Sequence, residues 1–112
     1  MAQVVISEEL KNEILKKFKE KSKKIFKQMY SLQENPKKGK LLGVVGGIVI
    51  KEIRSEGFRF YFITDGYKLK ILGTSQLTDL LIRFVRMSDK KEQQKIIEEI
   101  KKVLATLGSK GF

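Results

Sequence analysis

Arginine occurs in only one part of this basic chain. The 112-residue sequence contains 20 lysines and 4 arginines against 13 acidic residues, which gives a formal net charge of +11. The four arginines are Arg54, Arg59, Arg83 and Arg86. A guanidinium group binds phosphate through two parallel hydrogen bonds, whereas the lysine ammonium acts as a point charge. The segment from Arg54 to Arg86 is therefore the first candidate for a phosphate-binding site.

Apolar and arginine side chains alternate within this segment, as they do in strands whose two faces differ. One expected face is apolar and consists of Phe58, Phe60, Phe62, Leu80, Ile82 and Phe84. The opposite face is mixed and consists of Arg59, Tyr61, Ile63, Leu81, Arg83 and Val85. We expect the apolar face to pack on helices and the mixed face to present Arg59, Tyr61 and Arg83 together, a surface suited to holding phosphates and stacking bases. The alternative is that the arginines only solvate a strand and that Tyr61 is half-buried packing.

The composition excludes several kinds of chemistry. The chain has no cysteine and no histidine, so disulfides, thiolate nucleophiles, Cys or His zinc sites and Ser-His-Asp systems cannot be built. We expect no metal and no cofactor. A small domain with this charge typically binds phosphate polymers or an acidic protein, and the alternative is a lysine-rich surface that only keeps the chain in solution.

The sequence gives no sign of a membrane segment. Its longest apolar run, residues 41–50, contains three glycines and is shorter than the roughly 20 residues that span a bilayer. The amino terminus has no basic start before an apolar stretch, unlike a signal peptide. We therefore expect a cytoplasmic protein without a membrane partner.

Helical patterns lie at the two ends of the chain. Residues 7–34 carry an apolar stripe at helical spacing behind a capping Ser7, and they form either one helix or a helical hairpin whose break falls near residues 21–24. Residues 89–107 form the last helix, with an Asp89–Glu92 capping box at the start and Gly108 at the end. Before the first helix, residues 3–6 could supply a short strand.

The middle of the chain predicts a sheet. Strands are expected at residues 48–54, 58–64, 68–72 and 80–86, with an Asp65-Gly66 hairpin turn. Residues 37–47 read as a basic, glycine-rich loop; Gly39-Lys40 within it lacks the spacing of a phosphate-binding loop. The fold class is therefore α+β: a single domain over residues 1–112, with an N-terminal helix or helical hairpin packed on a four-stranded, mainly antiparallel sheet and a C-terminal helix.

Three stretches resemble the RelE/ParE toxin superfamily of toxin–antitoxin systems. They are residues 32–43 (LQENPKKGKLLG), 50–63 (IKEIRSEGFRFYFI) and 81–91 (LIRFVRMSDKK). Within the superfamily they are most similar to the RelE-like and the phage-derived HigB-like branches, archaeal members included. The order and spacing of the three stretches carry the resemblance.

The resemblance implies a metal-independent endoribonuclease that cuts messenger RNA on the ribosome and is silenced by a cognate antitoxin protein. In such enzymes the RNA 2′-OH attacks the adjacent phosphate while cations stabilise the developing charge. Arg59 matches the family arginine that holds the scissile phosphate, Arg54 matches a basic strand position with Lys51 nearby, and Arg86 matches a basic position at the end of the last strand. Lysines in the loop and in the final turn would bind or steer RNA, namely Lys37, Lys38, Lys40, Lys90 and Lys91.

The sequence also departs from the family pattern. Glu52 stands where relatives usually have a basic residue, and it is either a general base or the partner of Arg54 or Lys51 in an ion pair. No clear counterpart exists for a C-terminal tyrosine that stacks on RNA in several members. A non-catalytic binding module on the same scaffold therefore stays open, as do a gyrase-poisoning toxin and a lysine-rich thermostable domain with a structural role.

Overall fold

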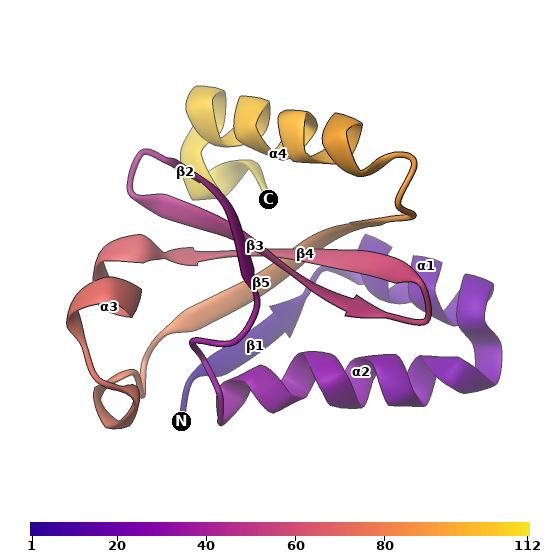
Figure 1. The fold of residues 1–112 in the computed structure, drawn as a ribbon, viewed down its shortest axis with the longest axis horizontal. Helices are drawn as coiled ribbons and strands as arrows, with labels where there is room; N and C mark the ends of the chain where they lie inside the picture. Colours follow the sequence, from indigo (N-terminus) through magenta and orange to yellow (C-terminus); the bar gives the residue numbers. More distant parts are fainter.

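The computed structural model describes all residues, 1–112, and shows an α+β fold built on one five-stranded sheet (Figure 1). The strands are β1 (Gln3–Ile6), β2 (Lys40–Val45), β3 (Ile48–Ser55), β4 (Phe58–Asp65) and β5 (Leu81–Ser88). Their order across the sheet is β1-β5-β4-β3-β2, with β1 parallel to β5 and every other pair antiparallel. The edges are therefore β1 and β2.

Helices cover both faces of the sheet. The helices are α1 (Glu8–Phe18), α2 (Ser22–Tyr30), α3 (Gly66–Ile71) and α4 (Gln93–Leu107). Figure 1 shows α1 and α2 on one side of the strands and α4 on the other. No helix combines the length and the apolar character needed to cross a membrane.

Alternation along the strands divides the interior into two cores. The larger core lies between the sheet and α1–α2 and contains Phe60, Phe62 and Phe84 beside Ile14 and Ile25. The smaller core, under α4, is formed by Ile50, Tyr61, Ile63, Val85, Ile97, Ile100 and Leu104. The predicted apolar face is thus confirmed as the face that packs on the N-terminal helices. All of the fully buried aromatic rings except Tyr61 lie on that side.

The predicted α+β class is confirmed, but the sheet differs from the prediction in strand number and in direction. The short strand at residues 3–6 forms and makes the sheet mixed, because β1 runs parallel to β5. The predicted loop at residues 37–47 is wrong for residues 40–45, which pair with β3 as an edge strand, whereas residues 46–47 form the turn between the two strands. Gly43 lies at the irregular point of this pairing, which is where glycine is common in a strand.

The predicted strand at residues 68–72 is wrong, because these residues belong to α3 and its end. Asp65 does not begin a hairpin; its carboxylate accepts a hydrogen bond from the backbone N–H of Lys68 at 3.0 Å and caps the helix. Leu69 and Leu72, three residues apart, pack against the larger core, whereas Ile71 is 57% exposed. Helical spacing therefore explains the burial and strand alternation does not.

Residues 7–34 form two helices, one of the two arrangements that the sequence left open. The first ends at Phe18, where Lys19 takes a positive φ of 50°, and one turn of 3-10 helix leads to Ser22. The break thus precedes the expected position at residues 21–24. The last helix begins at Gln93 instead of residue 89, and Asp89 caps the preceding turn by accepting from the N–H of Glu92 at 2.8 Å.

Candidate functional site

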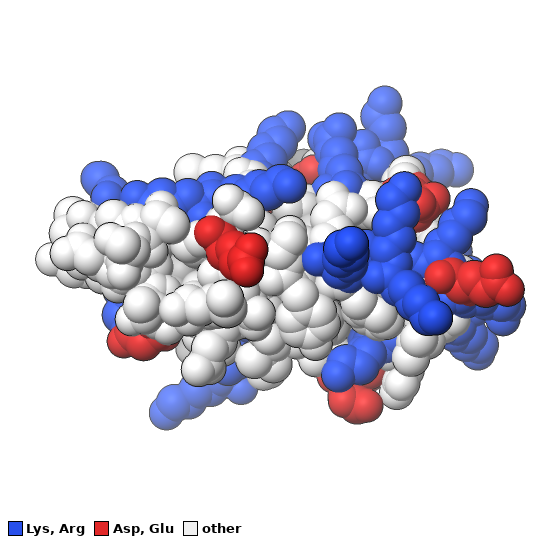
Figure 2. All heavy atoms as spheres, turned by 90° about the horizontal axis from the view of Figure 1, so that it is seen from below, with Lys and Arg blue, Asp and Glu red and all other residues white.

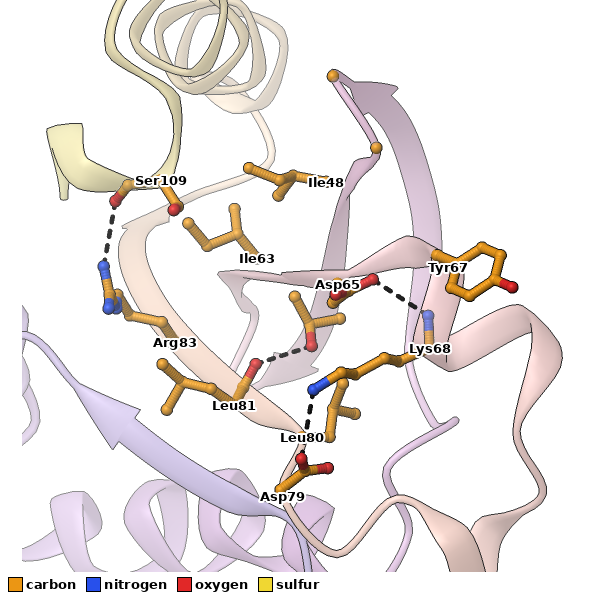
Figure 3. A pocket seen from close by; sticks show the side chains of 13 residues that line it. Ile48, Ile63, Asp65, Tyr67, Lys68, Asp79, Leu80, Leu81, Arg83 and Ser109 are labelled. Carbon is orange, nitrogen blue, oxygen red and sulfur yellow. Dashed lines mark hydrogen bonds and ion pairs between the residues drawn. The ribbon is translucent and has the colours of Figure 1, made fainter.

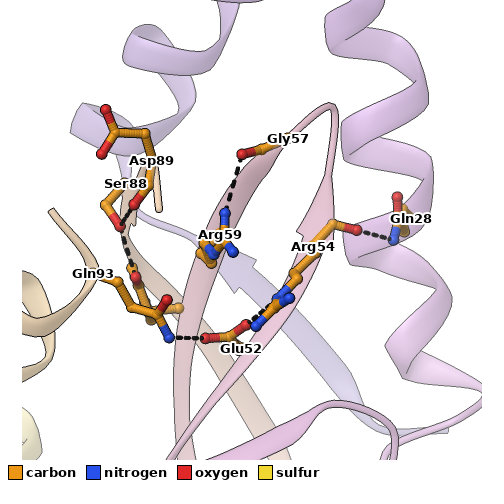
Figure 4. A network of polar contacts seen from close by, with 9 residues as sticks. Gln28, Glu52, Arg54, Gly57, Arg59, Ser88, Asp89 and Gln93 are labelled. Atoms are coloured by element: carbon orange, nitrogen blue, oxygen red, sulfur yellow. Dashed lines mark hydrogen bonds and ion pairs between the residues drawn. The ribbon is translucent and has the colours of Figure 1, made fainter. Parts of the chain in front are cut away.

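Two rows of polar side chains cross three strands on the face that α4 covers. In one row Glu52 of β3 pairs with Tyr61 of β4, which pairs with Arg86 of β5. In the next row Arg54 pairs with Arg59, which pairs with Ser88. These polar rows lie beyond the apolar part of the smaller core, near the N-terminus of α4 (Figure 4).

A bulge in β5 brings Arg86 into the first row. The register of β4 against β5 shifts between Tyr61 and Phe62, so that Phe62 pairs with Phe84 but Tyr61 pairs with Arg86. Simple alternation from Phe84 would have placed Arg86 on the α1–α2 face; the extra residue in the bulge reverses this. The guanidinium carbon of Arg86 lies 5.2 Å from the centre of the Phe112 ring, which packs against the smaller core.

Glu52 is a buried carboxylate held by two donors. The residue is 1% exposed. Its Oε2 accepts from Nε of Arg54 at 2.8 Å, and its Oε1 accepts from Nε2 of Gln93 at 3.1 Å (Figure 4). Gln28 of α2 donates in turn to the backbone carbonyl of Arg54 at 2.9 Å. Of the two partners that the sequence suggested for Glu52, the structure pairs it with Arg54.

Arg59 is a buried cation without a carboxylate partner. The residue is 7% exposed, and Nη1 donates to the carbonyl of Gly57 at 3.2 Å. Its Nε is the one buried side-chain nitrogen or oxygen that has no hydrogen-bond partner, and none of the six ion pairs includes Arg59. Burying a charge in this state costs free energy, and an anion bound here would offset that cost.

Tyr61 lies at the centre of the rows and is fully buried. Its hydroxyl is 2.6 Å from Oγ of Ser88, and the Ser88 hydroxyl donates to the carbonyl of Asp89 at 2.9 Å. Since Ser88 has a single hydroxyl proton, Tyr61 is the donor in the first bond. Burial raises the pKa of Tyr61, and the nearby charge of Glu52 adds to this, while the hydrogen bond with Ser88 and the two nearby arginines act in the opposite direction. The phenol is therefore a neutral donor at physiological pH.

The expected open surface of Arg59, Tyr61 and Arg83 is wrong in one respect. The three residues do share the predicted face, but α4 covers it, so the ring of Tyr61 has no exposed surface on which a base could stack. The apolar stripe of α4 was visible in the sequence, but the sequence did not indicate what the stripe packs against.

Arg83 lies apart from the polar rows. Its Nη1 donates to the carbonyls of Ser109 at 3.1 Å and Phe112 at 3.2 Å. Arg83 also lines a pocket of about 420 Å³ with Asp65, Lys68 and Asp79 (Figure 3). It therefore holds the C-terminal segment in place and does not contact Arg59.

The predicted RNA-binding lysines fall into separate groups. Lys38 and Lys40 line a pocket of about 280 Å³ together with Glu52 and Arg54. Lys90 and Lys91 are exposed in the turn before α4. Arg54 itself is 54% exposed and is the solvent-exposed member of its row, whereas Arg59 and Tyr61 do not line this pocket.

Lys51 does not join Arg54. It lies on the opposite face of β3, where its Nζ donates to the carbonyl of Lys37 at 2.9 Å, and the Lys37 side chain is exposed. Lys51 is 5% exposed, and burial lowers its pKa. Side chains at adjacent positions on a strand point to opposite faces, which explains why Lys51 and Glu52 lie on opposite faces of β3.

Sequence reasoning missed the three polar residues that hold the rows in place: Gln28, Ser88 and Gln93. Gln28 and Gln93 come from helices and reach β3 over 26 and 41 residues of sequence, so no local pattern indicated them. Ser88 directly precedes Asp89 at the end of the last strand, and its place on the face of Tyr61 depends on the bulge.

Positive charge is spread well beyond these rows. Figure 2, seen from below the view of Figure 1, shows lysine and arginine side chains gathered over the end of the molecule that α1 and α2 form, whereas the opposite end is mostly uncharged. No family model matches this sequence, and comparisons with curated proteins and with solved structures likewise find no match.

Proposed function

We propose that the protein is the toxin of a type II toxin–antitoxin system, a RelE-like, metal-independent endoribonuclease that cuts messenger RNA on the ribosome in the cytoplasm and is silenced by a cognate antitoxin. One observation carries the proposal: Arg59 is a buried guanidinium with an unpartnered Nε and no carboxylate beside it. The resemblance of residues 50–63 to the family motif supports the same reading of this arginine.

The arrangement suits recognition of a phosphodiester. Arg54 and Arg59 are cross-strand partners, so their Cα atoms lie about 5 Å apart and both guanidinium groups can reach one phosphate. The phosphate would approach past the exposed Arg54, and Lys38 and Lys40, which line a pocket beside Arg54, would steer the RNA. Arg86 lies in the neighbouring row, but its Nη1 donates to the carbonyl of Val85 at 2.8 Å and its guanidinium lies over the Phe112 ring, so Arg54 and Arg59 are the arginines that would hold the phosphate.

Cleavage would proceed by attack of the 2′-oxygen on the adjacent phosphorus. The P–O bond to the 5′-oxygen breaks, and the products are a 2′,3′-cyclic phosphate and a 5′-hydroxyl end. Glu52 is the carboxylate of the rows that can accept the 2′-hydroxyl proton once Gln93 releases it, and the leaving 5′-oxygen takes a proton from water or from the neutral phenol of Tyr61. Arg54 and Arg59 stabilise the charge on the phosphoryl oxygens.

The test is cleavage of a translated message in a cell-free extract, mapped by primer extension. The wild-type protein is expected to create new ends inside the translated region, and Arg59→Met is expected to reduce them by about 10²-fold, the usual loss when one transition-state donor is removed. Lys23→Met, an exposed lysine of α2, is the matched control and should cleave as the wild type does. Intact message with folded wild-type protein would contradict the proposal.

A second candidate function is a non-catalytic RNA-binding module. It is favoured by the burial of Glu52 and Tyr61, since both oxygens of the carboxylate already accept hydrogen bonds. In that case RNA stays intact but binds with an affinity that falls steeply with salt. Replacing Arg54 by glutamine should then lower the slope of log K against log salt by about one.

A further inference from the structure

An open groove lies between the edge strand β2 and helix α3. Its volume is about 580 Å³, and its apolar lining is formed by Leu41, Val44, Val49, Tyr67 and Leu69. We call it the β2–α3 groove. Leu41, Val44 and Tyr67 are 58%, 57% and 72% exposed, so large apolar side chains meet solvent along a strand that has a neighbour on one side only.

The pairing of β2 with β3 explains why these side chains gather here. Leu41 pairs with Lys51 and Val44 with Val49, which places all four on the sheet face that α1 and α2 cover elsewhere. Figure 1 shows these two helices beneath the other part of the sheet, with α3 alone beside the corner of β2 and β3. The exposed backbone of an edge strand is a template for a further strand.

Lys51 lies in this apolar lining as a buried cation. It is 5% exposed, its one hydrogen bond goes to the carbonyl of Lys37, and it belongs to no ion pair. An ammonium group has three N–H donors, so two remain available. Burial lowers the pKa of Lys51, which is the direction expected for an ammonium that lacks a counter-charge.

We propose that the β2–α3 groove binds an extended segment of an acidic protein, which adds a strand to β2 and places a carboxylate beside Lys51. Side chains of an added strand alternate between the two faces of the sheet. Apolar residues at alternate positions would cover Leu41, Val44 and Tyr67. An aspartate or glutamate among them would give the Lys51 ammonium a counter-charge and accept its remaining hydrogen bonds. Main-chain pairing gives affinity in this mode and the side-chain pockets give specificity.

Charge argues against a second copy of the chain as the occupant. Each copy carries a net charge of +11. Lys40 lies on β2 itself, Lys70 lines the groove, and the end of the Lys101 side chain lies over Gly43. Pairing two β2 edges would bring these lysines together, and like charges that face each other oppose association. An acidic segment meets the same lysines favourably.

This inference does not rest on the proposed RNA cleavage. The groove and the polar rows lie on opposite faces of β3, because Lys51 and Val49 point away from Glu52 and Arg54. A variant that blocks the groove can therefore be expected to leave RNA cleavage or binding unchanged.

The experiment uses the full chain and a display library of random ten-residue peptides. Peptides are selected on the wild-type protein and then measured on Val44→Glu, which places a negative charge in the groove. Val5→Glu is the matched control, since Val5 is 44% exposed on the other edge strand, β1. Amide hydrogen exchange, read by NMR, locates the bound peptide.

We expect selected peptides to carry an acidic residue flanked by apolar residues at alternate positions. Val44→Glu should weaken them at least tenfold and Val5→Glu less than twofold, and the amides of β2 should become protected on binding. Changing the acidic residue of the peptide to its amide should weaken binding to wild type about tenfold and binding to Lys51→Met less than twofold. Circular dichroism checks that each variant is folded.

Several results would overturn the proposal. They are the absence of enriched peptides, enriched peptides without acidic residues, equal affinity for Val44→Glu and wild type, or protection of amides outside β2. Dimerisation of the free protein that Val44→Glu abolishes would assign the edge to a second copy instead.

Discussion

Arg59 is the residue at which stability and the proposed function oppose each other. Its guanidinium is buried with Nε unpartnered, so Arg59→Met removes a desolvated charge and keeps most of the side-chain volume. We expect the free energy of unfolding to rise by about 1 kcal/mol, because apolar replacement of buried charge is commonly stabilising, while RNA cleavage or binding falls. Urea denaturation beside the cleavage assay measures both; a loss of stability would contradict the description of Arg59 as an uncompensated cation.

Glu52 and Arg54 are expected to be energetically coupled. Removing Arg54 leaves the 1% exposed carboxylate of Glu52 with one donor, Gln93. Because Arg54 is 54% exposed, solvent screens part of the pairing, and Arg54→Met should lower the free energy of unfolding by about 1–2 kcal/mol. The double variant Glu52→Gln/Arg54→Met should recover at least half of that loss. Additive losses in the double-mutant cycle would show that the two side chains do not interact.

At the residue scale, the sequence predicted which side chains share a face but not what surrounds them. Alternation correctly placed Arg59, Tyr61 and Arg83 together, since strand geometry is local. The place of Arg86 depended on a bulge, and the contact of Gln93 with Glu52 depends on where α4 docks, 41 residues further along the chain. Neither leaves a signal in a single sequence.

At the scale of elements, the first residue of α3, Gly66, lies very close to β3 and to the turn before it. A Cβ placed on Gly66 would lie 2.8 Å from both the carbonyl oxygen of Gly47 and Cγ1 of Val49, and the N–H of Gly66 donates to that same carbonyl at 2.9 Å. Gly66→Ala must push the start of α3 away from β3. We expect it to lower the free energy of unfolding by about 1–3 kcal/mol.

Gly73 provides the control for this effect. Its φ of −73° suits alanine, and a Cβ there meets only the Gln76 side chain, at 3.5 Å. Gly73→Ala should therefore change the free energy of unfolding by less than about 0.5 kcal/mol. Equal effects of the two alanines in denaturant titrations would mean that the close approach at Gly66 does not constrain α3.

The elements that the sequence predicted correctly are those with long periodic patterns. The helical ends of the chain and the strands near residues 48–54, 58–64 and 80–86 were found because their alternation or helical spacing runs over several turns or residue pairs. The two elements that were predicted wrongly, β2 and α3, are short. In each of them a local sequence signal favours another structure, and tertiary contacts override that signal. In β2 the glycines suggested a loop, but pairing with β3 satisfies its backbone.

At the scale of the whole molecule, the sheet is covered on both faces, and this decides which groups are buried. The sequence contained the apolar stripes of the helical segments at its two ends but not the side of the sheet that each segment would cover. With α4 on the face of Arg59 and Tyr61, the polar rows became largely buried, and Arg54 is their exposed member. With α1 and α2 on the other face but away from β2, the β2–α3 groove stayed open.

The burial of Lys51 should make the free energy of unfolding of the whole protein depend on pH. Burial lowers the pKa of Lys51 in the folded protein below its ordinary value of 10.5, so folding at neutral pH includes a desolvation cost that the unfolded chain does not carry. Between the lowered pKa and 10.5, the folded protein has released the proton while the unfolded chain still holds it. The free energy of unfolding gains a positive slope with pH from this residue in that window.

Tyr61 acts in the opposite sense at higher pH. Its pKa is raised above the ordinary value of 10.0, so above pH 10 the unfolded chain loses the phenolic proton first and the free energy of unfolding falls.

Comparison of wild type with Lys51→Met separates the two residues, because Tyr61 contributes to both proteins alike. We expect Lys51→Met to be more stable by about 1 kcal/mol at pH 7, and we expect this difference to shrink as the pH approaches 10.5. Denaturant titrations at pH 7, 9 and 10.5 measure it, and a difference that stays constant would show that the buried Lys51 ammonium carries no desolvation cost.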